Sequence, residues 1–169
     1  MSSPLSVLLL GPSAGKTFIS MILKNFINEQ HLLSTNEFPS CRPTVGKETI
    51  LLTSKHNQLV ELIELGSPLM SLWRSFTPSI FKFMYVISDI ELRSGVIDCL
   101  AFLLDCSHHD NASESDVLVL VNCFNNGCLV NLHDLLEIKY FTQFFRSLKI
   151  KRFVVEKECI EDIGGWFSE

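Results

Sequence analysis

The stretch that decides the fold is Val7-Leu8-Leu9-Leu10-Gly11-Pro12-Ser13-Ala14-Gly15-Lys16-Thr17-Phe18-Ile19. Its aliphatic start predicts a buried strand, which breaks into a turn between two glycines and then continues as a helix. At such a turn the backbone N–H groups and the start of the helix bind an anion, a lysine reaches the outer phosphates, and a hydroxyl holds Mg²⁺. Residues 11–17 therefore predict a phosphate-binding loop.

The spacing of this loop differs from the usual pattern, which is G-x-x-x-x-G-K-[ST]. Only three residues separate Gly11 from Gly15, so either the loop is one residue short or Leu10 stands where the first glycine is expected. Short Gly-Lys-Thr strings also arise by chance, and an ordinary strand-to-helix turn is then the alternative interpretation.

Length and composition indicate one folded domain that covers residues 1–169. Apolar residues make up 47% of the chain and charged residues 20%, which favours an extensive core, an apolar docking surface, or both. The net charge of −5 leaves no basic surface for a nucleic-acid backbone, so we expect no nucleic-acid partner.

The sequence offers no direct membrane anchor. No stretch reaches ~18 consecutive apolar residues, and the N-terminus lacks the basic region and cleavage site of a signal peptide. Ser2 stands where N-myristoylation requires glycine. We therefore expect a soluble, cytoplasmic protein.

The six cysteines form no C-x-x-C pair and have no Cys/His spacing typical of zinc. We interpret them as reduced, mostly buried thiols, and we expect no metal site among them. They are Cys41, Cys99, Cys106, Cys123, Cys128 and Cys159.

Aliphatic strands alternate with helical periods along the whole chain, which is typical of an α/β fold with a mostly parallel sheet. The predicted strands are residues 6–10, 49–53, 59–65, 81–87, 117–121 and 153–155. The turn-rich residues 54–57 predict an antiparallel hairpin between the second and third strands. Apolar residues at helical spacing predict helices over residues 18–26, 92–104, 132–148 and 160–167.

Three short segments together resemble those of Ras-like small GTPases, and the chain looks most like a divergent member of the ADP-ribosylation factor-like (Arf-like) group. They are the phosphate loop, Arg42-Pro43-Thr44-Val45-Gly46 before the second strand, and Glu64-Leu65-Gly66 at the end of the third. The resemblance covers nearly the whole chain. It implies a Ras-like P-loop GTPase fold with about six strands in a mostly parallel sheet, one antiparallel edge strand, and helices on both faces.

The resemblance implies that GTP or GDP binds together with Mg²⁺. Lys16 corresponds to the lysine that neutralises the β- and γ-phosphates, and Thr17 to the hydroxyl that binds Mg²⁺. Thr44 corresponds to the first-switch threonine, which senses Mg²⁺ and the γ-phosphate, and Glu64 would reach the metal through a water. The implied nucleotide-binding set is Gly11, Pro12, Ser13, Ala14, Gly15, Lys16, Thr17, Phe18, Thr44, Gly66, Ser67, Asn122, Asn125 and Lys157. Without a ligand, Thr17 would be a helix cap and Thr44 a turn residue.

The second switch departs from the family pattern of Asp, Gly and Gln, because this chain has Glu64, Ser67 and Pro68 at those positions. Ser67 retains an N–H but lacks the torsional freedom of glycine. Pro68 has neither a side-chain amide nor an N–H, so it cannot orient a water molecule. We therefore expect no catalytic residue, and hydrolysis slower than the ~10⁻⁴ s⁻¹ of unassisted small GTPases.

The base-binding motif also departs from the family pattern Asn-Lys-x-Asp, since the corresponding residues are Asn122-Cys123-Phe124-Asn125. The amide of Asn125 offers one acceptor and one donor where a carboxylate accepts two hydrogen bonds from guanine, which costs ~1–3 kcal/mol. The motif therefore does not predict whether the site selects guanine over other bases. In the last family motif, at residues 156–158, Lys157 could cover the base.

Three functions are compatible with these residues. The first is a divergent Arf-like protein that binds GTP with Mg²⁺ and recruits a protein effector or trafficking complex through its switch surface, in membrane or ciliary traffic. The second is a nucleotide-free scaffold for protein–protein interaction, which the altered loop, Ser67 and Asn125 favour. The third is a small kinase, which needs an arginine-rich lid, whereas the five arginines here are scattered along the sequence.

Overall fold

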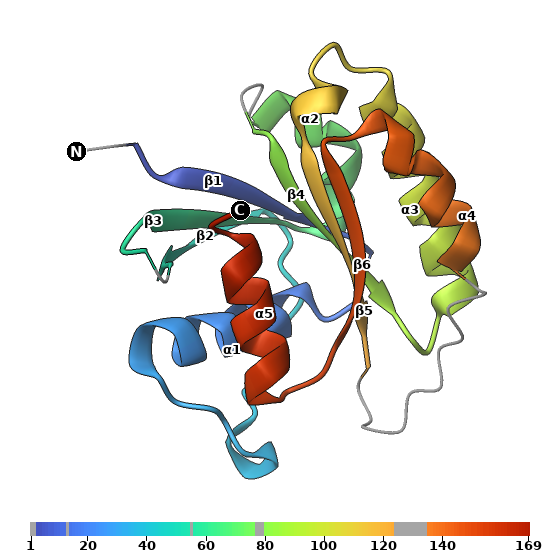
Figure 1. Cartoon of the computed structure of the whole chain (residues 1–169). Helices are drawn as coiled ribbons and strands as arrows, with labels where there is room; N and C mark the ends of the chain where they lie inside the picture. The colour runs from blue at the N-terminus through green and yellow to red at the C-terminus, as the bar shows by residue number, and fades with distance from the viewer. Residues whose placement is uncertain (1–2, 13, 55, 77–79, 124–134) are drawn as a thin grey trace.

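The computed structural model describes residues 3–12, 14–54, 56–76, 80–123 and 135–169 (Figure 1). Six strands form one sheet in the order β2-β3-β1-β4-β5-β6. Their bounds are β1 (Leu5–Leu10), β2 (Lys47–Thr53), β3 (Leu59–Leu65), β4 (Lys82–Ser88), β5 (Asp116–Asn122) and β6 (Ser147–Phe153). Edge strand β2 pairs antiparallel with β3, and the other neighbouring strands of the described sheet are parallel. The predicted α/β class and mostly parallel sheet with one antiparallel edge strand are confirmed.

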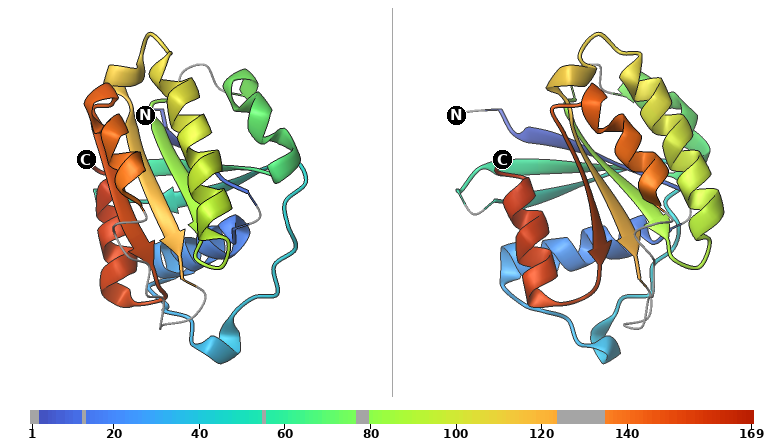
Figure 2. Two further views of the ribbon diagram at one scale, coloured as in Figure 1. Left: turned by 90° about the vertical axis from the view of Figure 1, so that its right-hand side faces the viewer. Right: turned by 45° about the vertical axis from the view of Figure 1, so that its right-hand side comes forward.

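Helices cover both faces of this sheet (Figures 1 and 2). One face carries α1 (Lys16–Glu29) and α5 (Lys157–Trp166), and the other carries α2 (Trp73–Phe76), α3 (Leu92–Ser107) and α4 (Leu136–Lys139). Short 3-10 helices are η1 (Thr35–Glu37), η2 (Ser67–Leu72), η3 (Ala112–Glu114) and η5 (Tyr140–Phe144). No helix in the described part of the chain is long and apolar enough to cross a membrane.

Strand β1 lies between two apolar cores. Val7 and Leu9 pack in the core that α1 and α5 cover, whereas Leu8 and Leu10 pack in the core that α3 covers. Because side chains alternate across a strand and helices cover both faces, each of these four positions is apolar. This burial explains why the strand before the loop is a continuous aliphatic run rather than an alternating pattern.

The last third of the chain differs from its predicted elements. The helix predicted over residues 132–148 is wrong in its second half, because η5 ends at Phe144 and β6 begins at Ser147. The strand predicted at residues 153–155 is β6, which ends at Phe153. Leu148 and Ile150 pack on the α3 side and alternate with lysines, so this segment has the two-residue period of a strand. The leucines before it had suggested a longer helical period.

The thiols are largely within the cores. Cys99, Cys106 and Cys123 are buried and Cys41 and Cys159 are half-buried. Burial raises the pKa of Cys99 and of Cys106 above the ordinary value, so both remain thiols at neutral pH. Cys128 lies outside the described residues.

A buried ion pair joins the amino-terminal ends of β4 and β5 to the C-terminal helix. Lys82 Nζ lies 3.4 Å from Asp116 Oδ2 and donates a hydrogen bond to the Trp166 carbonyl oxygen at 2.7 Å. Burial opposes the charge of Asp116, but hydrogen bonds from Arg146 and Lys82 keep the pKa of that carboxyl below its ordinary value. These contacts hold α5 against the sheet at the end opposite the predicted phosphate loop.

Candidate functional site

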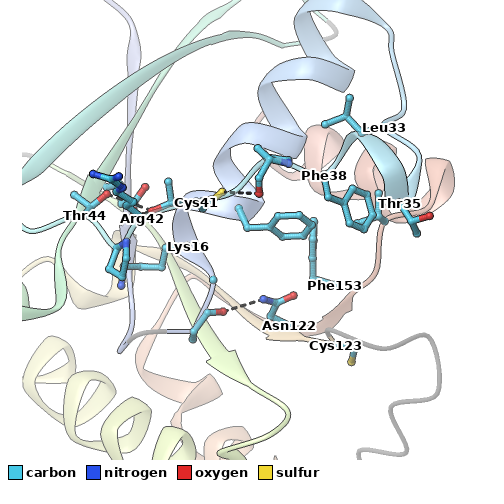
Figure 3. A pocket seen from close by; sticks show the side chains of 18 of the residues that line it. Lys16, Leu33, Thr35, Phe38, Cys41, Arg42, Thr44, Asn122, Cys123 and Phe153 are labelled. Carbon is cyan, nitrogen blue, oxygen red and sulfur yellow. Dashed lines mark hydrogen bonds between the residues drawn. The ribbon is translucent and has the colours of Figure 1, made fainter.

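Most of the predicted site residues that the structure describes meet at the carboxyl-terminal edge of the parallel strands. Lys16 follows β1, Glu64 lies next to the end of β3, and Asn122 ends β5. In open α/β sheets the crevice outside the carboxyl ends of the strands is where ligands bind. A cavity of about 760 Å³ opens there, and residues from four strand ends and from the loop before β2 line it (Figure 3).

The loop after β1 depends on its two glycines. Gly11 has φ 132° and Gly15 has φ 85°, which are conformations that side-chain-bearing residues rarely adopt. A Cβ atom on Gly11 would also lie 3.1 Å from the Val86 backbone nitrogen and closer still to the Val86 oxygen. Leu10 is fully buried within β1, so the loop proper begins at Gly11 and ends where Lys16 starts α1.

Lys16 is a buried cation at the start of α1. Its side chain is 5% exposed, and Nζ donates hydrogen bonds to the carbonyl oxygens of Gly11 at 2.5 Å and Pro12 at 3.0 Å. Burial lowers the pKa of Lys16, and the nearby Glu64 carboxylate acts in the opposite direction. A buried ammonium that neighbouring carbonyls hold in place is well positioned to meet an anion above the loop.

Three oxygen-bearing side chains from distant parts of the sequence converge beside the loop. Thr17 Oγ1 donates a hydrogen bond to Glu64 Oε1 at 2.7 Å and lies 3.3 Å from Thr44 Oγ1. Glu64 is 1% exposed, and its second oxygen, Oε2, is buried without a hydrogen-bond partner among the described residues. A buried, unpartnered carboxylate oxygen beside two hydroxyls fits the oxygen ligands that Mg²⁺ prefers.

This oxygen set differs from a multidentate metal centre. Among the described residues, no group of three or more His, Cys, Asp or Glu side chains could hold a metal ion. A cation here would therefore have one carboxylate and two hydroxyls from the chain and would need further ligands from water or phosphate. Mg²⁺ commonly binds in this way, because it keeps several waters and takes oxygens from a substrate phosphate.

The segment around Thr44 packs tightly on the end of β3. The Gly66 N–H donates a hydrogen bond to the Gly46 carbonyl oxygen at 2.8 Å. A Cβ atom on Gly66 would lie 2.7 Å from the Val45 carbonyl carbon and closer still to the Thr44 oxygen. Gly66 therefore allows a backbone approach that holds Thr44, which is buried, beside Thr17.

Ser67 and Pro68 start the 3-10 helix that follows Gly66. Ser67 lines the cavity. Pro68 lies in the first turn of this helix, where a backbone N–H would have no partner within the helix, so the N–H that proline lacks is not needed. Gly11 N–H contacts the sulfur of Met70 in the same helix at 3.2 Å. This contact joins the predicted phosphate loop to the predicted second switch, and no sequence pattern signalled it.

The opposite end of the cavity is apolar and aromatic. Phe38 and Phe153 lie on the side away from Thr44 in Figure 3, and Phe18 contacts Phe38 edge-on with ring centroids 5.2 Å apart. The Asn122 side chain, which is 1% exposed, donates a hydrogen bond to the Ala14 carbonyl oxygen at 2.9 Å. Asn122 thus ties the end of β5 to the loop after β1.

The other predicted site residues have different positions. Ser13 and Asn125 lie outside the described residues. Lys157 does not line the cavity; it begins α5, and its Nζ lies 3.9 Å from Glu161 Oε1. Gly11 and Pro12 contribute through the carbonyl oxygens that hold Lys16, while Ala14, Gly15, Lys16, Thr17 and Phe18 line the cavity directly.

The loop between α1 and β2 contributes residues that the sequence pattern did not indicate. Leu33, Phe38, Cys41 and Arg42 all line the cavity, yet residues 28–42 show no regular period of apolar residues. The Ser-x-x-Glu pattern at Ser34 was a usable signal, since it is a capping box. Hydrogen bonds from the Ser34 backbone and hydroxyl lower the pKa of Glu37 to about 2.

The cavity thus combines a glycine-flanked loop with a buried lysine and a cluster of side-chain oxygens at one end with an aromatic wall at the other. Such an arrangement can hold the phosphates of a nucleotide at the polar end and its base at the apolar end. No protein-family model matches this chain, and no curated protein is significantly similar to it in sequence.

Proposed function

We propose that this chain is a divergent Arf-like protein with a Ras-like P-loop fold that binds GTP with Mg²⁺ and acts as a regulatory switch. The observation that carries the proposal is the convergence of Thr17, Thr44 and Glu64 from three separate segments beside Lys16. A nucleotide-binding loop alone would not require this convergence. Such an arrangement would couple a metal-bound phosphate to the surface segment that carries Thr44.

In the proposed complex each group has a distinct role. The Lys16 ammonium and the loop N–H groups hold the β- and γ-phosphates. Thr17 and Thr44 would hold Mg²⁺ directly and Glu64 would hold it through a water, and the ion would neutralise charge on the phosphate oxygens. The aromatic wall that includes Phe38 and Phe153 contacts the base.

Hydrolysis is weak or absent in this proposal. Pro68 cannot orient an attacking water, because its ring lacks both an N–H and a side-chain amide. Its position in the first turn of η2 supports a structural role, since proline favours the start of a helix. Bound GTP would then persist unless another protein supplied the missing catalytic group.

The switch surface would recruit a protein effector or trafficking complex. Val45 is 75% exposed although it directly follows the buried Thr44, so an apolar contact point adjoins the residue that would sense the γ-phosphate. From the Arf-like resemblance we propose partners in membrane or ciliary traffic, and a cytoplasmic protein that associates with the cilium through those partners. The net charge of −5 argues against a nucleic-acid partner.

Nucleotide binding is tested by ligand-dependent stabilisation. At GTP·Mg²⁺ concentrations about a hundred times Kd, the wild-type protein should gain ~2.7 kcal/mol of unfolding free energy. Lys16→Ala should lower the affinity about a hundredfold, because it removes a charged contact worth ~3 kcal/mol. Lys24→Ala, an exposed change on the same helix, is the control and should bind like the wild type.

The nucleotide that co-purifies with the protein gives a second test. Mass spectrometry of the released ligand should find intact GTP, which would support both binding and failed hydrolysis. The proposal would be refuted if the purified protein contained no nucleotide and GTP·Mg²⁺ did not stabilise it.

One observation favours the nucleotide-free scaffold as a second candidate. The polar groups of the cavity already satisfy one another in part, since Lys16 bonds to two carbonyls, Thr17 to Glu64, and Asn122 to Ala14. A fold that no longer needs a ligand would retain such contacts. Partner binding that Lys16→Ala leaves unaltered, together with no stabilisation by GTP, would select the scaffold.

A further inference from the structure

Arg42 is a second cation that lines the cavity. Lys16 and Arg42 are the two positively charged side chains among the described residues that line it, and Glu64 is the one negatively charged side chain. Lys16 is buried and bonded to carbonyls, whereas Arg42 is exposed and makes no hydrogen bond or ion pair within the described part of the chain. Its guanidinium is therefore available to a ligand.

Three of the other four arginines have different surroundings. Arg74 pairs with Asp105 and Arg146 pairs with Asp116, so the charge of each is already matched. Arg93 is exposed on α3, which contributes no residue to the cavity. An unmatched guanidinium at the cavity wall is thus specific to Arg42 among these four arginines.

The backbone holds Arg42 near the proposed metal site. Two residues span at most about 7 Å, so the Arg42 backbone stays close to Thr44. Pro43, which lies between them, restricts the backbone, and Thr44 is itself buried beside Thr17. Figure 3 places Arg42 with Thr44 on the side of the cavity away from Phe153. The guanidinium therefore belongs to the phosphate end and not to the base end.

Charge explains what a second cation would do there. A nucleoside triphosphate carries more negative charge than a diphosphate, and the added charge is on the terminal phosphate. The Glu64 carboxylate offsets part of the positive charge that Lys16 and Mg²⁺ bring, so a triphosphate leaves excess negative charge in the cavity. An arginine fork binds phosphate oxygens in a bidentate manner, which matches both the charge and the geometry of that group.

We propose that Arg42 binds the terminal phosphate and makes the cavity select nucleoside triphosphates over diphosphates. This inference rests on the proposed nucleotide site but assigns a residue that the phosphate-loop pattern does not include. In the ligand-free structure Arg42 lines the cavity but is exposed to solvent, so its guanidinium is free to bind the terminal phosphate.

The experiment measures the affinities of GDP and of the non-hydrolysable β,γ-imido analogue of GTP, both with Mg²⁺, by calorimetry. Arg42→Ala should weaken binding of the analogue about tenfold, which corresponds to ~1.4 kcal/mol, and should change GDP binding less than twofold. Arg42→Lys should lose less affinity for the analogue than Arg42→Ala, because lysine keeps the positive charge but lacks the paired N–H donors of the guanidinium. Arg93→Ala is the matched control and should leave both affinities unchanged. Added salt should reduce the discrimination of the wild type more than that of Arg42→Ala.

The possible results separate this inference from the proposed function. Wild-type protein that binds neither nucleotide overturns the proposed function. Wild-type protein that binds both, with Arg42→Ala weakening both equally or neither, overturns the role of Arg42 and leaves the nucleotide site standing. Thermal unfolding of each ligand-free variant confirms that the exposed substitution has left the fold intact.

Discussion

Gly66 offers a sharp test of how the two predicted switch segments depend on each other. In Gly66→Ala the added Cβ would lie 2.7 Å from the Val45 carbonyl carbon, whereas ordinary van der Waals contact begins at 3.4 Å. The backbone at Val45 must therefore move by at least about 0.7 Å, the difference between these distances, and Thr44, whose oxygen would lie closer still to the added Cβ, must move with it. The neighbours are backbone atoms, so rotation of a side chain cannot relieve the clash.

The cost has two parts. Overpacking a tight site destabilises a protein by ~1–3 kcal/mol, and the hydrogen bond from Gly66 N–H to the Gly46 oxygen contributes a further ~0.5–1.5 kcal/mol if it breaks. We expect Gly66→Ala to lower the free energy of unfolding by about 3 kcal/mol. For a chain of this size the corresponding fall in Tm is about 6–12 °C.

Gly46→Ala is a matched control, because a Cβ atom there would have no neighbour within 4 Å. Both variants are compared by urea denaturation and by thermal unfolding, with and without GTP·Mg²⁺. Gly66→Ala should also reduce the stabilisation by nucleotide, since it displaces Thr44 from Thr17. If the two variants unfold within 0.5 kcal/mol of each other, the close packing of Gly66 on Thr44 and Val45 is refuted.

Two further predictions concern the free energy of unfolding and residues outside the predicted phosphate loop. Lys82→Met should lower the free energy of unfolding by about 3 kcal/mol in urea denaturation, because it removes a partner of the buried Asp116 and leaves the Trp166 carbonyl unpaired; a loss below 1 kcal/mol would contradict this role. The capping carboxylate of Glu37 has a folded pKa of about 2, below its ordinary 4.5, so its contribution is fully present above pH 4.5 and is lost as the pH falls toward 2. Glu37→Gln should flatten the stability profile in that window, and an unaltered profile would count against the cap.

The C-terminal third shows where local patterns are insufficient. Leucines at helical spacing suggested one helix through residue 148, but β6 begins at Ser147 and pairs in parallel with β5. Parallel pairing depends on a partner strand about 30 residues earlier, so the short alternating segment could be recognised as a strand only with β5 beside it. The earlier strands were predictable because each is a long aliphatic run buried on both faces.

Some residues of the candidate site could also be predicted from local sequence, and others could not. Lys16 and Thr17 were predictable because the loop that presents them is local and needs glycine at Gly11 and Gly15. The position of Lys157 was not predictable, since only the structure shows that it lies beside Glu161 and does not line the cavity. The same holds for Arg42, whose place at the cavity depends on how the loop before β2 folds back.

By itself the sequence determined the α/β class, the loop after β1 and the antiparallel hairpin, because short-range periodicity and glycine conformations set these features. Only the tertiary structure decided that Thr44 and Glu64, which are 27 and 47 residues from Thr17, meet its hydroxyl. The register of β1 against β3 brings Glu64 to the loop, and the close approach at Gly66 brings Thr44. Contacts of this kind depend on how distant segments pair, and no local pattern encodes that pairing.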